Sequence, residues 1–170
     1  HYFYENDLLG SDLVVVAPDH ASVGRARKFA KLLHAEWAVI DRRVGEGLQT
    51  APFGITGNVQ GKRAILIDDI IDTGTSMTLA SEALTAAGVT DIYAVAPHAV
   101  LSEQAVDKLA KSAISKTLVA NTIEVPDDKR FDKLVQLSVA ATFAEAIRRV
   151  DACESIEDIM RSPDNLDVKL

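Results

Sequence analysis

One stretch of the sequence gathers the residue types best suited to chemistry. An apolar run ends in two adjacent carboxylates, and a short turn rich in hydroxyls follows it. The residues of interest are Asp68, Asp69, Asp72, Thr73, Gly74, Thr75 and Ser76. Free amides and hydroxyls at a helix N-terminus, with a glycine that permits close approach, form a cradle for phosphate. Carboxylates can accept hydrogen bonds from a vicinal diol or hold hydrated Mg²⁺ through its waters. Together they describe a site for a sugar phosphate.

A purely structural interpretation of the same stretch is also available. Asp69 and Asp72 could cap the helix that follows, and Thr73 and Ser76 could be ordinary turn residues. That interpretation suits an isolated acidic turn. The complete string, from the apolar run to the hydroxyl-rich turn, favours a ligand site.

The surrounding pattern predicts the elements that position this stretch. β-branched runs predict strands over residues 12–17, 37–41, 63–68, 91–96 and 117–120, and longer periodic segments predict helices over 22–33, 76–87, 103–109 and 140–152. Continuous apolar strands separated by helices favour an α/β fold of three layers, a mostly parallel sheet with helices on both faces. Ligands bind such sheets at the carboxyl ends of the strands. Residues 42–61 form the longest aperiodic stretch and predict a functional or mobile loop.

Composition narrows the class of protein. The 170 residues are 48% apolar and 25% charged, as in a soluble globular domain, which we assign to residues 1–155, with a charged tail over 156–170. The net charge of −7 argues against a nucleic-acid-binding surface. The single Cys153 suits a reducing cytoplasm. The sequence has neither an apolar run of about 18 residues nor a signal-peptide pattern, so we expect no membrane association.

The residues that follow the third predicted strand resemble the PRPP-binding motif of type I phosphoribosyltransferase-like proteins. Five segments extend the resemblance over residues 12–155. In order and spacing they resemble the C-terminal half of the ribose-phosphate pyrophosphokinases (PRPP synthetases). These segments are VVVAPDHASVGRARKFAKLL, WAVIDRR, GNVQGKRAILIDDIIDTGTS, YAVAPHAVLSEQAVDKLAKSAISKTLVANTI and LSVAATFAEAIRRV.

The resemblance implies a role for each candidate residue. Residues 72–76 would bind the 5-phosphate of ribose 5-phosphate, and Asp68 and Asp69 would contact its ribose hydroxyls. Asp19 would hold the Mg²⁺ that bridges this substrate and the transferred pyrophosphate. The implied reaction is attack of the ribose 1-hydroxyl on the β-phosphorus of MgATP, which gives PRPP and AMP. Such a transfer depends mainly on positioning and charge neutralisation.

The resemblance also implies a larger assembly. In the family, ATP is bound mainly by an N-terminal domain, which we expect to be absent from this sequence because the chain starts at His1 and not at a methionine. The family further implies a dimer-based hexamer in the cytoplasm.

Two loops depart from the family pattern. The family usually has Pro-Asp-x-Gly-Gly where this chain has Ala21 and Ser22 after Asp19 and His20, so the family's loop conformation is less easily reached. The family's Lys-x-Arg falls on Arg42 and Val44, which leaves Arg42 as the candidate catalytic cation. The polar family segment further along this loop falls on residues 48–51 and is lost. Binding of ribose 5-phosphate is therefore better supported than catalysis.

These departures leave two alternatives to an active enzyme. One is a non-catalytic regulatory subunit that keeps the ribose 5-phosphate site. The other is a phosphoribosyltransferase that consumes PRPP, although no nucleobase hood is identifiable.

Two arginines lie on the helix after the first loop. We expect Arg25 to be a minor anion contact and Arg27 to lie on a solvated face.

Overall fold

The computed structural model describes residues 2–6, 8–41, 54–157 and 159. The strands are β1 Leu13–Ala17, β2 Glu36–Asp41, β3 Gly54–Thr56, β4 Arg63–Ile67, β5 Ile70–Ile71, β6 Asp91–Ala96, β7 His98–Ala99, β8 Lys116–Ala120 and β9 Leu134–Leu137. The helices are α1 Tyr2–Glu5, α2 Val23–Leu32, α3 Thr75–Ala86, α4 Ala105–Lys111 and α5 Ala140–Asp151, with a 3₁₀ turn at Asp127–Lys129.

Within the described residues, seven strands form one sheet in the order β3-β2-β1-β4-β6-β8-β9. Every neighbouring pair is parallel except β2 and β3. The chain runs from β1 to β2 on one side and returns to β4 on the other, so the loops after β1 and β4 leave adjacent strand ends. A topological switch point of this kind is where ligands bind in open α/β sheets. The short strands β5 and β7 form a separate parallel pair.

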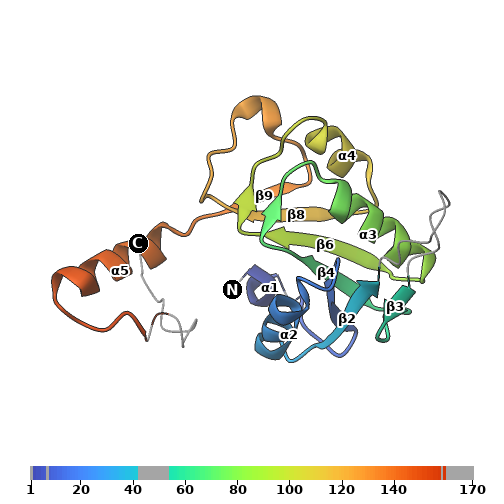
Figure 1. Cartoon of the computed structure of the whole chain (residues 1–170), viewed down its shortest axis with the longest axis horizontal. Coiled ribbons are helices and arrows are strands. Elements are labelled where there is room, and N and C mark those ends of the chain that lie inside the picture. Colours follow the sequence, from blue (N-terminus) through green and yellow to red (C-terminus); the bar gives the residue numbers. More distant parts are fainter. Residues whose placement is uncertain (1, 7, 42–53, 158, 160–170) are drawn as a thin grey trace.

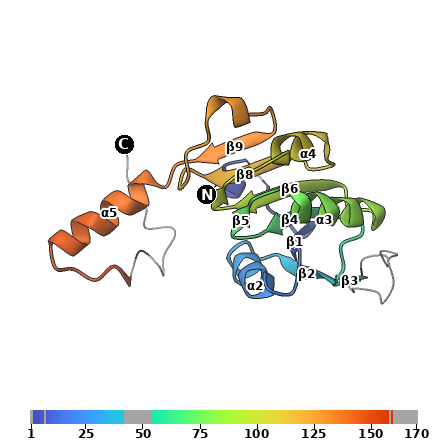
Figure 2. The same cartoon turned by 45° about the horizontal axis from the view of Figure 1, so that its top comes forward.

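Successive residues of β4 divide between two apolar layers. Ala64 and Leu66 belong to the layer that contains buried residues of α3 and α4, and Ile65 and Ile67 belong to the layer with α1 and α2. This alternation follows from the two-residue period of a strand. Figures 1 and 2 show α2 and α3 on different sides of the sheet. The predicted three-layer α/β/α arrangement with a mostly parallel sheet is confirmed.

The N-terminal segment forms a helix that the sequence pattern did not predict. Phe3 of α1 is 4% exposed and makes edge-to-face contacts with Phe29 of α2 and Tyr93 of β6, at centroid distances of 6.1 and 5.9 Å. These contacts extend the layer around α2. A four-residue helix is too short for a periodic signal, and its position depends on this tertiary packing.

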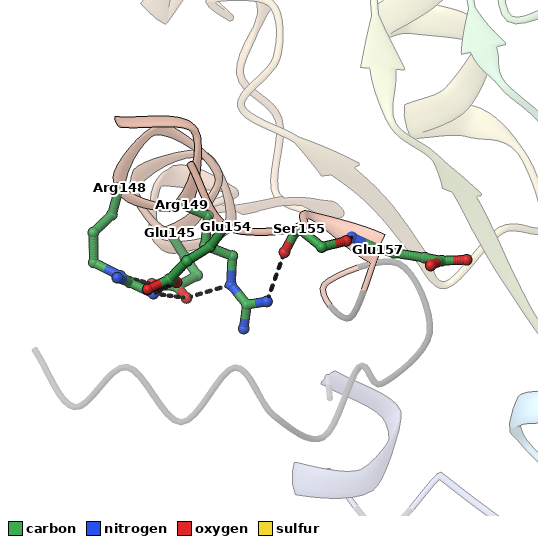
Figure 3. Close-up of polar contacts among 6 residues, drawn as sticks. All are labelled: Glu145, Arg148, Arg149, Glu154, Ser155 and Glu157. Atoms are coloured by element: carbon green, nitrogen blue, oxygen red, sulfur yellow. Dashed lines mark hydrogen bonds and ion pairs between the residues drawn. The ribbon is translucent and has the colours of Figure 1, made fainter. Parts of the chain in front are cut away.

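Helix α5 matches the expected range but lies apart from the sheet. Figure 1 shows it projecting from the body of the molecule, and none of its residues is buried. Phe143, Ile147 and Val150 are 59%, 68% and 65% exposed. On its polar side, Glu145 accepts hydrogen bonds from Arg148 and Arg149 (Figure 3).

No helix among the described residues is long and apolar enough to span a membrane.

Candidate functional site

The carboxyl end of β4 leads directly into residues 68–76, which contain the predicted ligand-binding residues and are called the ligand loop below. Asp68 and Asp69 follow the buried strand, and α3 begins at Thr75. Gly74 precedes α3 with φ at 73°, in the left-handed region. A Cβ at Gly74 would lie 3.4 Å from both the Ala105 carbonyl oxygen and Leu109 Cγ of α4. Glycine is therefore required here both for the turn and for the close approach of α4.

The structural interpretation in which aspartates cap α3 is wrong. Gly74 occupies the cap position, and no capping hydrogen bond from a side chain is seen there among the residues that the structure describes. Asp72 Oδ1 instead accepts a 2.5 Å hydrogen bond from Ser102 Oγ. Asp69 Oδ2 accepts one from Arg25 NH2 at 2.9 Å. Both carboxylates therefore face other parts of the chain and do not cap α3.

A cavity of about 150 Å³ lies at this loop. Its lining residues are Asp68, Ile70, Ile71, Asp72, Thr73, Gly74, Thr75, Ser76 and Met77. The lining includes six of the seven residues predicted as ribose 5-phosphate contacts, and the seventh, Asp69, is 57% exposed beside it. A larger hollow of about 500 Å³ lies around the 3₁₀ turn and β9, where it contains none of the predicted residues.

The segment after β6 supports the ligand loop along its length. His98 N donates to the Asp69 carbonyl at 3.1 Å, Val100 N donates to that of Ile71 at 3.0 Å, and Ser102 N donates to that of Asp72 at 3.0 Å. This ladder fixes the backbone between the paired carboxylates and the hydroxyl-rich turn. Sequence reasoning placed the two segments after consecutive predicted strands but gave no pairing or register between them.

The structure adds a cation that sequence reasoning missed. Lys108 of α4 directs Nζ to Thr75 Oγ1 at 3.0 Å and to the Thr73 carbonyl at 3.3 Å. Its ammonium therefore lies at the hydroxyl-rich turn, where a phosphate would need positive charge. No local signal marks Lys108 in the sequence, because only the packing of α4 against Gly74 brings it there.

The two carboxylates are bridged by a residue of α2. Arg25 contacts Asp68 Oδ1 through NH1 at 3.1 Å and Asp69 Oδ2 through NH2 at 2.9 Å. Ser22 Oγ also donates to Asp68 Oδ1, at 2.8 Å. Burial raises the pKa of Asp68, the Ser22 hydroxyl lowers it, and the charges of Asp69 and Asp19 raise it further. The sequence predicts Arg25 only as a minor anion contact, and the structure adds its pairing with the two carboxylates.

Asp19 lies in the loop after β1, next to the same cluster. Its Oδ1 accepts a hydrogen bond from the Ser22 amide at 3.0 Å. No group of three or more acidic, histidine or cysteine residues within the described ranges could hold a metal ion. Mg²⁺ usually takes one or two carboxylates together with waters and substrate phosphates. The donors present therefore fit an ion shared with a substrate and not a closed protein cage.

The remaining residues considered in the sequence analysis are those of the loop after β2 and Arg27 of α2. Arg42 and Val44 lie outside the described residues, as do residues 48–51. Arg27 lies over the Trp37 ring, with its guanidinium carbon 5.5 Å from the centroid. The structure thus brings together Asp19, Asp68 and Asp69 through Ser22 and Arg25, with the hydroxyl-rich turn beside them.

Comparison with known proteins gives consistent matches. The model of the phosphoribosyl synthetase-associated domain family matches residues 44–161, more than half of the chain. Ribose-phosphate pyrophosphokinase 1 of Lactococcus lactis is 48% identical over 141 residues, which cover 83% of this chain and 44% of that protein. Ribose-phosphate pyrophosphokinase 1 of Listeria monocytogenes is 48% identical over 158 residues, which cover 93% of this chain and 49% of that protein. The chain spans about half the length of these curated relatives.

A solved structure agrees with the fold. The phosphoribosylpyrophosphate synthetase of Mycobacterium smegmatis superposes with a TM-score of 0.78 at 36% identity, over 84% of this chain and 46% of that one. This superposition agrees with the α/β fold and mostly parallel sheet that the sequence predicts. The family match, the identities and the superposition together show that this chain belongs to the phosphoribosyl synthetase-associated domain family, among the homologues of ribose-phosphate pyrophosphokinase.

Proposed function

We propose that the chain binds ribose 5-phosphate as one half of a ribose-phosphate pyrophosphokinase. The observation that carries this proposal is the cavity at the carboxyl end of β4, where a hydroxyl-rich turn adjoins a pair of carboxylates. Relatives with 44% to 48% identity that are named ribose-phosphate pyrophosphokinases support it. The enzyme would transfer pyrophosphate from ATP to ribose 5-phosphate and release PRPP and AMP.

Each part of the site has a place in that chemistry. The turn at residues 72–76 and the first amides of α3 would bind the 5-phosphate, with Lys108 as a compact counter-charge. Asp68 and Asp69 would accept hydrogen bonds from the ribose hydroxyls. Asp19 would hold Mg²⁺, which supplies charge neutralisation at the transferred pyrophosphate. The chain's own contribution is to orient the ribose 1-hydroxyl toward the β-phosphorus of ATP.

We assign the chain to the C-terminal half of the enzyme, because the five segments described above resemble that half in order and spacing. ATP would then be held mainly by an N-terminal domain outside this sequence, in a cytoplasmic, dimer-based hexamer. Joining the chain to the N-terminal half of the Lactococcus lactis relative tests this assignment. We expect the fusion, and not the 170-residue chain alone, to form PRPP from ribose 5-phosphate and ATP.

A non-catalytic, ribose 5-phosphate-binding subunit is the second candidate. It is favoured by the replacement of two family glycines by Ala21 and Ser22 and by Val44 in the loop that carries Arg42. In that case the fusion would bind ribose 5-phosphate but would stay inactive. Val44→Arg combined with Arg42→Lys would then restore turnover. Activity without these changes would reject the second candidate.

Calorimetric titration of ribose 5-phosphate, with and without Mg²⁺, tests the binding site itself. Asp68→Ala removes an acceptor for the ribose hydroxyls, and Thr75→Ala removes a hydroxyl from the proposed phosphate cradle. We expect each variant to weaken binding by about tenfold or more, because a hydrogen bond to a charged group is worth roughly 1.5–3 kcal/mol. Thr85→Ala is the matched control, since its hydroxyl bonds the Ser81 carbonyl near the far end of α3. Equal binding by all four proteins would remove the proposed site.

A further inference from the structure

The paired carboxylates are held asymmetrically. Asp68 Oδ1 accepts three hydrogen bonds, from Ser22 Oγ at 2.8 Å, the Asp69 amide at 2.9 Å and Arg25 NH1 at 3.1 Å. Asp69 Oδ2 accepts one from Arg25 NH2 at 2.9 Å. Across the part of the chain that the structure describes, neither Asp68 Oδ2 nor Asp69 Oδ1 has a hydrogen bond or ion pair. One oxygen of each carboxylate is therefore occupied and the other is left available.

Two available oxygens on adjacent residues match the two donors of a vicinal diol. Adjacent carboxylates repel one another unless a cation lies between them. The guanidinium of Arg25 bridges them with two of its planar donors, so it counters the repulsion and fixes their relative orientation. A sugar that lacks one hydroxyl would leave one of the two oxygens without a donor.

Ser22 connects this pair to the loop after β1. It is 2% exposed, donates through Oγ to Asp68, and donates through its amide to Asp19. Arg25 NH1 also contacts Ser22 Oγ, at 3.3 Å. The family resemblance expects glycine at this position, which has no hydroxyl. The serine therefore supplies a link between the two loops that glycine could not make.

We propose that Ser22 and Arg25 are positioning residues that orient Asp68 and Asp69 to select a vicinal diol, so that the site prefers ribose 5-phosphate to 2-deoxyribose 5-phosphate. This inference rests on the proposed function and deepens it. Neither residue is assigned contact with the substrate. Their effect is on which sugar the carboxylates accept, so the preference between the two sugars is the quantity to measure.

Calorimetric titration of both sugar phosphates at one Mg²⁺ concentration measures that preference. We expect the wild type to favour ribose 5-phosphate by roughly ten- to a hundredfold, the range of one hydrogen bond to a charged acceptor. Arg25→Gln should lose most of this preference. Arg25→Lys should keep part of it, because an ammonium keeps the charge without the planar fork. Ser22→Ala and Ser22→Gly should each reduce it by a smaller factor.

Arg27→Gln is the matched control, since Arg27 lies two residues along α2 and contacts Trp37. It should leave the preference unchanged. If Arg25→Gln keeps the wild-type preference, or binds both sugars more tightly, the role of Arg25 is rejected. If Arg25→Gln does not fold, an unchanged preference in Ser22→Ala rejects the positioning role.

The result for the wild type separates the two levels of the proposal. A wild type that binds neither sugar rejects the proposed function. A wild type that binds both sugars equally leaves the phosphate site in place and rejects the inference about the diol.

Discussion

At the scale of single residues, the proposed sugar-phosphate site uses Asp68 as a carboxylate although this residue is half-buried. Burial raises its pKa, and the hydroxyl of Ser22 opposes that shift. A folded-state pKa above the unfolded value means that ionised Asp68 disfavours folding once the pH rises above the unfolded value. The residue thus lowers stability at neutral pH while it supplies an acceptor to the proposed diol site. Such a conflict between stability and binding is common at functional positions.

Gly74 shows how one residue type links the ligand loop to α4. We predict that Gly74→Ala lowers the free energy of unfolding by about 1–2 kcal/mol for the left-handed backbone alone. The cost should be greater in total, because the new Cβ would lie 3.4 Å from Ala105 O and Leu109 Cγ. Urea unfolding measures it. Gly61→Ala is the matched control, with φ at 71° and no atom within 4 Å of its Cβ.

The two glycine variants separate backbone conformation from packing. Gly61→Ala should show the conformational cost only. If Gly74→Ala is no more destabilising than Gly61→Ala, the close approach of α4 makes no energetic contribution.

At the scale of elements, the hydroxyl-rich turn is assembled by α3, α4 and the segment after β6 together. Ser102 fixes Asp72, and Lys108 brings positive charge to Thr75. Each of these contacts joins residues at least thirty positions apart. Helix α4 therefore does more than cover the sheet, because its Lys108 supplies a cation to the hydroxyl-rich turn at the start of α3.

The sequence was sufficient to predict the longer strands and helices but not the N-terminal helix α1. Apolar runs located β1, β4 and β6 to within a residue or two, because burial on both faces leaves a continuous signal. Long-range side-chain pairing gave no such signal. The sequence predicts Arg25 as an anion contact, whereas its pairing with Asp68 and Asp69 depends on the position of α2 beside the loop after β4.

Helix α5 is stabilised along its polar side by a network of charges (Figure 3). Hydrogen bonds from Arg148 and then Arg149 lower the pKa of Glu145 to about 2. Because this pKa lies below the unfolded value, Glu145 stabilises α5 above pH about 4.5, and that contribution is lost as the pH falls through 2. We predict a ¹³C NMR titration midpoint near 2 for the Glu145 carboxyl.

Arg148→Gln should raise the Glu145 midpoint, because it removes two of the hydrogen bonds that the carboxylate accepts. Arg130→Gln is the matched control. It removes an exposed arginine whose ion pair is with Asp127, in a different element. A wild-type midpoint near 4.5 would show that the network does not form in solution.

At the scale of the whole molecule, the sheet couples two apolar layers, whereas α5 stands outside both. Ile65 and Leu66 are adjacent in β4, fully buried, and belong to opposite layers. A loss in either layer therefore weakens the same central strand. Helix α5 has twelve residues and none of them is buried. Isolated helices of about this length are marginally stable in water.

We predict that the molecule opens in two steps of unequal free energy. Leu66→Ala should lower the protection of amides in β1, β4 and β6 by about 2–5 kcal/mol in native-state hydrogen exchange, because it leaves a cavity in the core. The same variant should leave the exchange rates in α5 unchanged. Ile147→Ala is the reciprocal control, since Ile147 is 68% exposed and its loss should not alter protection in the sheet. If protection in α5 falls together with that of β4, the helix is part of the same cooperative unit, and its apolar side is buried in solution.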